Sequence, residues 1–269
     1  MSDPAESHHD HEKDLESEWD PSAHRLPVWA TIREAVQAIA KEWKALLKAI
    51  AVPALVLVAL DVAGEREYVE AVFPDLSSPL QDLLQIVADS ALSVGFAMMI
   101  AISCHRLVIL GVDSLPSAWG LFWSRRETRF LGWSALIAIP FGVVPILSAV
   151  LGSPLLMFLV LVPYSLYLVP RLSLVLPATA IGQRPTFKGS WRLSQSNAGP
   201  LFLVMFLPIL FLSALGGIMQ YWVGPLPPGE ITLRFLSALP RALLFLVGIA
   251  SLSKAFCWFT GEIEAKSPS

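Results

Sequence analysis

The chain has 269 residues, of which 55% are hydrophobic and only 15% are charged, and its mean hydropathy is +0.61. An average globular domain is about 45–50% apolar and about 25% charged. The first twenty residues hold eight acidic residues and one basic one, so the rest of the chain holds 14 acidic and 18 basic residues, a net charge of +4 against −3 for the whole chain. These figures indicate an integral membrane protein. They argue against three other classes as the leading interpretation: a water-soluble enzyme, a nucleic-acid-binding protein and a disulfide-rich domain.

The N-terminal arm divides into two parts. Residues 1–26 are polar and acidic, which is typical of a disordered cytoplasmic tail. Residues 27–45 place apolar side chains three or four positions apart, from Trp29 and Ile32 to Trp43, with charged side chains on the other face. This spacing predicts an amphipathic helix that lies on the membrane interface. The alternative is a helix packed against loops of the same protein.

The body of the chain, residues 46–260, consists mainly of long apolar stretches. About 20 mostly apolar residues are needed to cross roughly 30 Å of hydrocarbon, and six stretches meet this condition. They predict an all-α, polytopic membrane domain with six transmembrane helices, followed by a short cytoplasmic tail at residues 261–269. The predicted spans are Leu46–Gly64, Leu83–Cys104, Phe130–Leu151, Leu155–Pro177, Pro200–Val223 and Phe235–Phe259.

The basic residues predict the orientation of these spans. The segment Glu65–Asp82 has one base, Arg66, among five acids, and the segment Gly224–Arg234 has only Arg234. The other Lys and Arg residues concentrate in the loops of the opposite side, which the positive-inside rule places in the cytoplasm. We therefore expect a multi-pass protein of the bacterial inner membrane with both termini in the cytoplasm.

Two parts of the chain are alike. One reads Arg106-Leu-Val-Ile-Leu and then Pro116-Ser-Ala-Trp-Gly120; the other reads Arg171-Leu-Ser-Leu-Val-Leu and then Pro185-Thr-Phe-Lys-Gly189. Each precedes a further span. A genuine repeat would relate two helical hairpins by an axis along the membrane normal. The match is short, so chance similarity is the alternative.

The same segments carry a resemblance to a known group. His105-Arg106-Leu-Val-Ile-Leu-Gly and Arg171-Leu-Ser-Leu-Val-Leu-Pro177-Ala-Thr-Ala, followed by Gly189-Ser190-Trp191, resemble a group of uncharacterised bacterial inner-membrane proteins. This group is similar, more distantly, to the membrane domain fused to some glycerophosphodiester phosphodiesterases. The likeness covers roughly residues 45–259 and implies a six-helix membrane domain without an established activity. The hydrolytic chemistry of the fused soluble domain is not implied.

Three ionisable residues fall inside the predicted spans. A central Arg or Asp costs about 2.5–3.5 kcal/mol on translocon scales. Asp61 and Asp89 lie in the outer halves of the first two spans, and Arg241 lies at a similar depth in the sixth. A pair between Arg241 and one of the aspartates would offset the desolvation of both charges. These residues indicate a proton- or substrate-coupled site. The alternative is a structural ion pair or an aqueous vestibule.

A second group of bases lies toward the inner leaflet. Arg106 and Arg171 each end a descending helix, where a guanidinium can reach the phosphate level and bind a lipid head group bidentately. Arg184, Lys188 and Arg192 follow close in sequence. Together these five bases predict a site for an anionic phospholipid or a phosphorylated ligand. The alternative is that they only set the topology, each adding roughly 1 kcal/mol of attraction to the leaflet.

The sequence contains no motif that indicates an enzyme or a bound cofactor. Phosphate-loop, zinc-protease and nucleophile-elbow motifs are absent. His8, His9 and His11 form a cluster in the tail, but a flexible tract offers a metal no fixed geometry, so we expect no specific metal site. His105 is the only histidine of the body, and neither Ser153 nor Ser213 is predicted near it.

The leading hypothesis is therefore a non-enzymatic membrane protein that binds, or helps to move, an anionic lipid or amphiphile at the inner leaflet, with Arg171 and Arg106 holding the head group. One alternative is a scaffold that recruits a cytosolic protein partner through the N-terminal arm. Another is a proton-coupled transporter of small solutes that uses Asp61, Asp89 and Arg241. Nothing in the sequence predicts a nucleic-acid partner or an oligomeric state.

Overall fold

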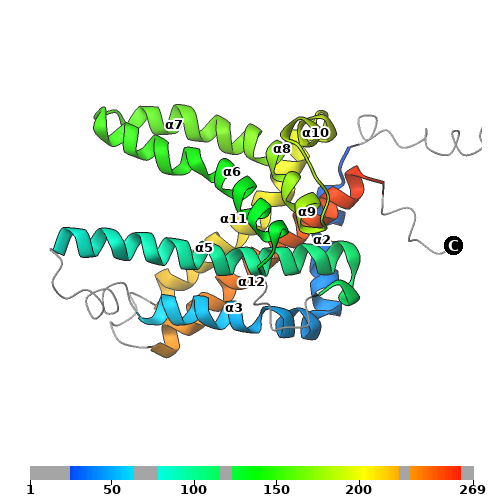
Figure 1. Ribbon diagram of the computed structural model, residues 1–269, viewed down its shortest axis with the longest axis horizontal. Helices are drawn as coiled ribbons and strands as arrows, with labels where there is room; N and C mark the ends of the chain where they lie inside the picture. The colour runs from blue at the N-terminus through cyan, green and yellow to red at the C-terminus, as the bar shows by residue number, and fades with distance from the viewer. Residues whose placement is uncertain (1–24, 64–77, 116–122, 224–230, 262–269) are drawn as a thin grey trace, which may run out of the picture.

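A computed structural model describes residues 25–63, 78–115, 123–223 and 231–261 of the chain (Figure 1). Side chains are described for most of these residues, but not for residues 60–91, 218–241 and a few others. The described part is all helical and contains no β-strand, as the sequence predicts. Its elements are α2 (Val28–Lys41), α3 (Trp43–Ala63), α5 (Ser78–Leu110), η1 (Val112–Ser114), α6 (Arg125–Val150), α7 (Pro154–Pro163), η2 (Tyr164–Leu168), α8 (Val169–Ser173), α9 (Val175–Ala180), α10 (Phe187–Leu193), α11 (Ala198–Val223) and α12 (Ile231–Phe259).

Each predicted span coincides with a long helix or a chain of helices. Within the described residues, four stretches are long and apolar enough to cross a membrane, and a fifth is added if α10 and α11 form one bent span. The four are Leu92–Leu110, Arg125–Val150, Pro154–Ala180 and Ala242–Phe259. The structure thus supports four or five spans, and the count of six stays a prediction.

Helix α6 begins five residues before the predicted span because it has a strong N-terminal cap. The Ser124 side chain accepts from the backbone N–H of Arg126, and Glu127 accepts from the backbone N–H of Ser124 at 2.8 Å, which completes a capping box. The helix ends at Val150, and Gly152, the second residue after it, has a φ of +62° that reverses the chain. Helices α6 and α7 therefore form a hairpin.

The stretch from Pro154 to Ala180 is one candidate span, and a π-helix interrupts it. The interruption, η2, lies between Pro163 and Pro170, whose rings leave carbonyls one turn earlier without their usual donors. The Tyr164 hydroxyl donates to the carbonyl of Ile137 at 2.8 Å and so joins the π-helix to α6. The sequence analysis does not predict this local change of helix type.

Helices α10 and α11 meet at a bend of 99°. Asn197, which is fully buried at this bend, accepts a hydrogen bond from the backbone N–H of Leu26 at 2.8 Å. The bend turns α10 across the end of the helix bundle, next to α8 and α9 (Figure 1). The predicted fifth span, Pro200–Val223, covers α11 but not this element.

The N-terminal helix α2 packs on the protein itself. Thr31 and Ala35 are buried against α12, with further contacts to α11, α5 and α3. Trp29 and Val36, which belong to the predicted apolar face, are instead 74% and 44% exposed. The fully buried positions of α2 are therefore small, and Val28 and Ile39 pack against the core beside them. The sequence left packing on loops of this protein as an alternative, but the observed partners are helices. Trp29 and Val36 lie on a second, outward face.

The core lies between α5, α11 and α12. Its fully buried positions are often small or polar, as at Ala250, Ser253 and Ala255 of α12, and small residues let helix backbones approach closely. The C-terminal ends of α5 and α12 gather with α2, α9 and α10 at one end of the molecule, on the right in Figure 1. We call this the basic end. These elements, together with α6 and the loop between α9 and α10, carry Arg106, Arg129, Arg184, Lys188, Arg192 and Lys254.

Candidate functional site

A pocket of about 530 Å³ lies at the basic end, between α6 and the loop that joins α9 to α10. Arg129 lines one wall and Arg184 lines another, and no acidic side chain is among the lining residues. The pocket is lined by Arg129, Gly132, Trp133, Leu136, Thr179, Gln183, Arg184 and Pro185. Two positive charges without a nearby carboxylate make this pocket a candidate anion site.

Helix α6 supplies half of the pocket from a single face. Gly132, Trp133 and Leu136 follow Arg129 by three, four and seven positions. The four residues therefore lie one after another on the same face of the helix. The capping box at Ser124 fixes where this helix starts, and it therefore fixes the position of Arg129 in the second turn. The arginine lies nearest the helix start, and the apolar side chains continue the wall along the helix.

The loop that carries Arg184 is shaped by a glycine. Gly182 has a φ of +90°, a conformation that residues with a Cβ rarely adopt. Its N–H donates to the carbonyl of Thr179 at 3.0 Å, and the N–H of Gln183 donates to the carbonyl of Ala178 at 3.0 Å. This is a Schellman motif, which ends α9 and turns the chain back toward α6. Arg184 is the second residue after the turn.

An aromatic contact holds the two walls together. The rings of Trp133 on α6 and Phe187 on α10 meet edge to face, with centroids 4.5 Å apart. Such a pair contributes about 0.5–1.5 kcal/mol beyond its buried area. Phe187 directly follows Thr186, whose side chain accepts from the backbone N–H of Gly189 and caps α10. The spacing between Arg129 and Arg184 is therefore set by packed side chains.

Both pocket arginines are available to a ligand. Arg129 and Arg184 are exposed, and neither makes a hydrogen bond or ion pair within the part of the chain that the structure describes. A guanidinium presents planar N–H donors that match a phosphate or carboxylate bidentately. Trp133 and the exposed Leu136 offer hydrocarbon contact next to the charges. The arrangement can bind a molecule with an anionic head and an apolar chain.

Arg171, a predicted head-group residue, is buried instead. It is 6% exposed, and its guanidinium carbon lies 4.4 Å from the ring centres of both Tyr167 and Trp191. Its Nη2 donates to the carbonyl of Gln195 at 2.9 Å, and the Ser190 hydroxyl donates to the carbonyl of Arg171. These contacts fasten α10 and the following turn to α8. Arg171 lines neither cavity described here.

Arg106 also holds the protein's own backbone. Its Nε donates to the carbonyl of Ser114 at 2.8 Å, and its Nη2 donates to the same oxygen. The Ser114 hydroxyl donates to the carbonyl of Gly111 at 2.7 Å, so the turn after α5 is closed from both sides. Lys188 and Arg192 are exposed on α10 but do not line the pocket. The structure thus places Arg184 alone of the five predicted bases in the pocket and adds Arg129.

The predicted charge pair within the spans lies outside the described side chains. Asp61, Asp89 and Arg241 lie on α3, α5 and α12, but their side chains lie outside the described residues. The tail cluster of His8, His9 and His11 lies outside them as well. Among the residues that are described, no group of three or more His, Cys, Asp or Glu side chains could hold a metal ion.

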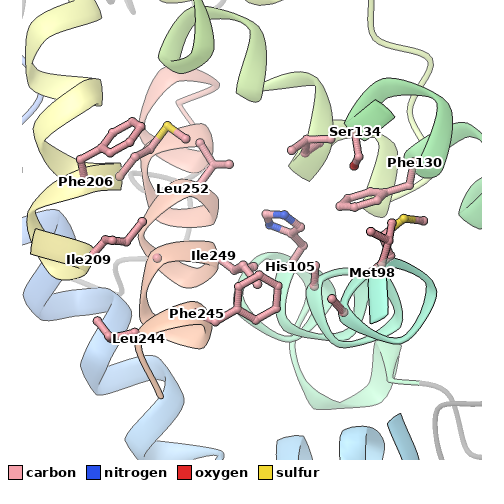
Figure 2. A pocket seen from close by; sticks show the side chains of 16 residues that line it. Met98, His105, Phe130, Ser134, Phe206, Ile209, Leu244, Phe245, Ile249 and Leu252 are labelled. Atoms are coloured by element: carbon pink, nitrogen blue, oxygen red, sulfur yellow. The ribbon is translucent and has the colours of Figure 1, made fainter. Parts of the chain in front are cut away.

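A second cavity, of about 350 Å³, surrounds His105 (Figure 2). The imidazole is 1% exposed, and its Nδ1 lies 2.7 Å from the Ser253 hydroxyl oxygen of α12. Ser253 is fully buried and does not line the cavity. The sequence predicts neither the cavity nor this pair. Both depend on how α5 and α12 pack.

The described residues thus form an all-helical structure in which four or five helices are long and apolar enough to cross a membrane, and they line cavities of different chemistry. A comparison with protein-family models, with curated proteins and with solved structures finds no match to this chain.

Proposed function

We propose that this protein binds an anionic lipid at its basic end, with the head group between Arg129 and Arg184. The observation that carries the proposal is a pocket in which two exposed guanidinium groups stand beside an apolar wall made by Trp133 and Leu136. An anionic phospholipid has the same two parts, a charged phosphate and a hydrocarbon chain. Charge-assisted, bidentate hydrogen bonds from arginine are among the strongest contacts that a phosphate can make.

The proposal includes a six-span protein of the bacterial inner membrane. Helices α3, α5, α6, α7–α9, α11 and α12 would be the spans, and the positive-inside rule would place the basic end and both termini in the cytoplasm. The pocket then lies at the inner leaflet, where the negative surface potential attracts each base by roughly 1 kcal/mol. The resemblance to the membrane domain of glycerophosphodiester phosphodiesterases stays a prediction.

We infer that α2 lies at the membrane interface while it packs on the protein. Its exposed Trp29 and Val36 would face the head-group region, and its small residues Thr31 and Ala35 face α12. Tryptophan is favoured at this depth because its ring is amphipathic. A cytosolic partner of the N-terminal arm and a transport function of the predicted charge pair have no support from a described contact, and they stay predictions.

The head-group contact is assigned to Arg129 and Arg184 rather than to Arg171 and Arg106. Arg171 is buried between two aromatic rings, and two nitrogens of Arg106 already bind the carbonyl of Ser114. A buried or engaged guanidinium must give up existing contacts before it can bind a phosphate. The two pocket arginines carry no such cost.

The proposal is tested by native mass spectrometry of the full chain released from nanodiscs that hold equal amounts of phosphatidylglycerol and phosphatidylethanolamine. The double variant Arg129→Gln/Arg184→Gln is compared with Lys188→Gln/Arg192→Gln, which removes the same charge at the same end but outside the pocket. Each lost charged hydrogen bond costs about 1.5–3 kcal/mol, so the first variant retains at least about tenfold less phosphatidylglycerol.

The control variant retains the anionic lipid within about twofold of the wild type, because only diffuse attraction to the leaflet is lost. Equal losses in both double variants would show that the bases act through their summed charge. That result refutes a head-group site between Arg129 and Arg184. Unchanged retention in the first variant refutes it as well.

A further inference from the structure

The pocket that holds Arg129 and Arg184, which we call the arginine pocket, has no counter-charge among the described residues. No acidic side chain lines it, and neither arginine makes an ion pair with a described residue. Glu127, the nearest acid in sequence to Arg129, is 3% exposed and already accepts hydrogen bonds from Arg126 and from the backbone N–H of Ser124. The pocket is therefore open to any anionic group that can reach it, including one from the protein itself.

The opposite charge is concentrated in the residues that precede the first described one. Residues 1–20 hold eight acidic residues and one basic residue. The last three acids alternate at Glu16, Glu18 and Asp20, and Trp19 stands between two of them. This stretch, which we call the acidic segment, thus offers carboxylates for guanidinium groups and an aromatic ring for an apolar wall.

The chain that carries the acidic segment is anchored beside the end of α9. Leu26 is 3% exposed, and its backbone N–H donates to the side-chain oxygen of Asn197 at 2.8 Å. Leu26 belongs to the same buried cluster as Ala178 of α9, and Ile181 packs against this cluster. The residue before Leu26 is exposed. The preceding chain therefore leaves the protein at the basic end.

The arginine pocket lies on another side of the same helix end. Thr179 and Gln183 line the pocket, and on a helix of 3.6 residues per turn they point away from the side of Ala178 that meets Leu26. A helix with its side chains is about 10–12 Å across. Asp20 precedes Leu26 by six residues, which span up to about 20 Å when extended. The acidic segment can therefore pass around α9 to the pocket.

We propose that the acidic segment, Glu16–Asp20, docks in the arginine pocket and competes there with the anionic lipid. Its carboxylates bind Arg129 and Arg184, and Trp19 lies against the apolar wall. The inference rests on the proposed lipid site and adds a competitor from the same chain. A short tether keeps the segment at an effective concentration on the order of millimolar. Exposed ion pairs are individually weak, so abundant anionic lipid displaces the segment.

The other exposed bases of this end suit the acidic segment less well. Lys188 and Arg192 lie on α10 outside the pocket. Within the pocket, Arg129 and Arg184 stand beside the ring of Trp133, so a peptide with carboxylates and an aromatic side chain finds both partners together. The two pairs of bases therefore give a specific test against diffuse attraction.

The test measures how much phosphatidylglycerol half-saturates the full chain in phosphatidylethanolamine nanodiscs, by native mass spectrometry. The variant Glu16→Gln/Glu18→Gln/Asp20→Asn removes the carboxylates of the acidic segment. It should lower the half-saturating phosphatidylglycerol content about fivefold, equivalent to about 1 kcal/mol, because the competitor is lost. The same three changes should have no effect in the Arg129→Gln/Arg184→Gln background, and they should keep their effect in the Lys188→Gln/Arg192→Gln background.

Asp3→Asn/Glu6→Gln/Asp10→Asn is the matched control, because it removes the same charge from the same tail farther from the anchor. It should change the half-saturating content by less than about twofold, since separated exposed charges are screened by salt. Equal effects of the two triple variants would show that the tail acts through its summed charge. That result overturns the proposal, as does an effect that persists without the pocket arginines.

Direct contact is tested by replacing Trp19 with the photo-cross-linker p-benzoylphenylalanine. In nanodiscs of phosphatidylethanolamine alone, cross-links should form to residues 129–136 or 179–187, and phosphatidylglycerol should suppress them. Cross-links to neither stretch, or cross-links that saturating phosphatidylglycerol leaves unchanged, would overturn the competition.

The two proposals fail in different ways. If Arg129→Gln/Arg184→Gln loses the lipid but the acidic-segment variant leaves half-saturation unchanged, the lipid site stands and the competition is refuted. If the arginine variant keeps the lipid, the lipid site itself is refuted, and the competition falls with it even where cross-links form.

Discussion

Two pairs of helices in this protein have similar apolarity but different surroundings. In the most apolar stretch of α5 and in that of α12, 50% of the residues are buried within the protein. The corresponding share is 17% in α6 and in the stretch from α7 to α9. Figure 1 shows the α6–α7 hairpin standing apart from the bundle at its far end. The comparison teaches that hydropathy identifies helices suited to a membrane but does not identify those that form the core.

The side chains of the two pairs explain the difference. The hairpin presents large aliphatic and aromatic residues outward, such as Ile146, Phe158 and Leu159, each at least 60% exposed. The packed pair buries small and polar residues, such as Ala250 and Ser253 on α12. Lipid is as apolar as leucine, so association between spans relies on close packing and hydrogen bonds rather than on apolar area. Small and polar residues provide both.

The largest expected effect compares two phenylalanines. Phe256 on α12 is 2% exposed in the core with Leu26 and Leu201, whereas Phe158 on the hairpin is 60% exposed. Phe256→Ala should lower the free energy of unfolding by about 3–5 kcal/mol through the cavity that it leaves. Phe158→Ala should change it by less than about 0.5 kcal/mol. Reversible unfolding in detergent micelles measures both. Similar losses would mean that the hairpin is packed as tightly as the core.

A smaller effect is expected at the base of the hairpin. Arg171→Gln removes the stacking on Tyr167 and Trp191, and a desolvated cation–π contact is worth about 2 kcal/mol. The variant should therefore unfold more easily while it keeps the anionic lipid in native mass spectrometry. Arg192→Gln, an exposed control on α10, should change neither quantity. Loss of the lipid with unchanged stability would instead identify Arg171 as a head-group residue, as the sequence predicts.

The smallest effect on stability comes from filling the arginine pocket. At Gly132 and Gly142, both on α6, a Cβ would meet no atom within 4 Å, but only Gly132 lines the pocket. Replacement of either glycine by leucine should stabilise the helix by up to about 1 kcal/mol. Gly132→Leu should also reduce phosphatidylglycerol retention severalfold, and Gly142→Leu should leave it unchanged. Equal retention in the two variants would contradict a lipid in this pocket.

The functional residues differ in how far the sequence could locate them. Arg184 was predicted because it is a base in a loop of the basic side. Arg129 could have been found from its spacing to Gly132, Trp133 and Leu136, which places a base above an apolar stripe on one helix face. Ser253 had no such signal, since its distance from His105 along the chain is 148 residues. That pair exists only because α5 and α12 pack together.

The sequence by itself determined that the chain is helical and suited to a membrane, where most of the long helices lie, and which end is basic. These properties depend on apolar run length, local spacing and charge, and each can be evaluated within one segment. The tertiary structure decided which face of α2 is buried and that Arg171 is buried between two aromatic rings. It also decided that Arg129 and Arg184 share a pocket. These properties depend on contacts between distant segments, and no single segment encodes the surface of its neighbour.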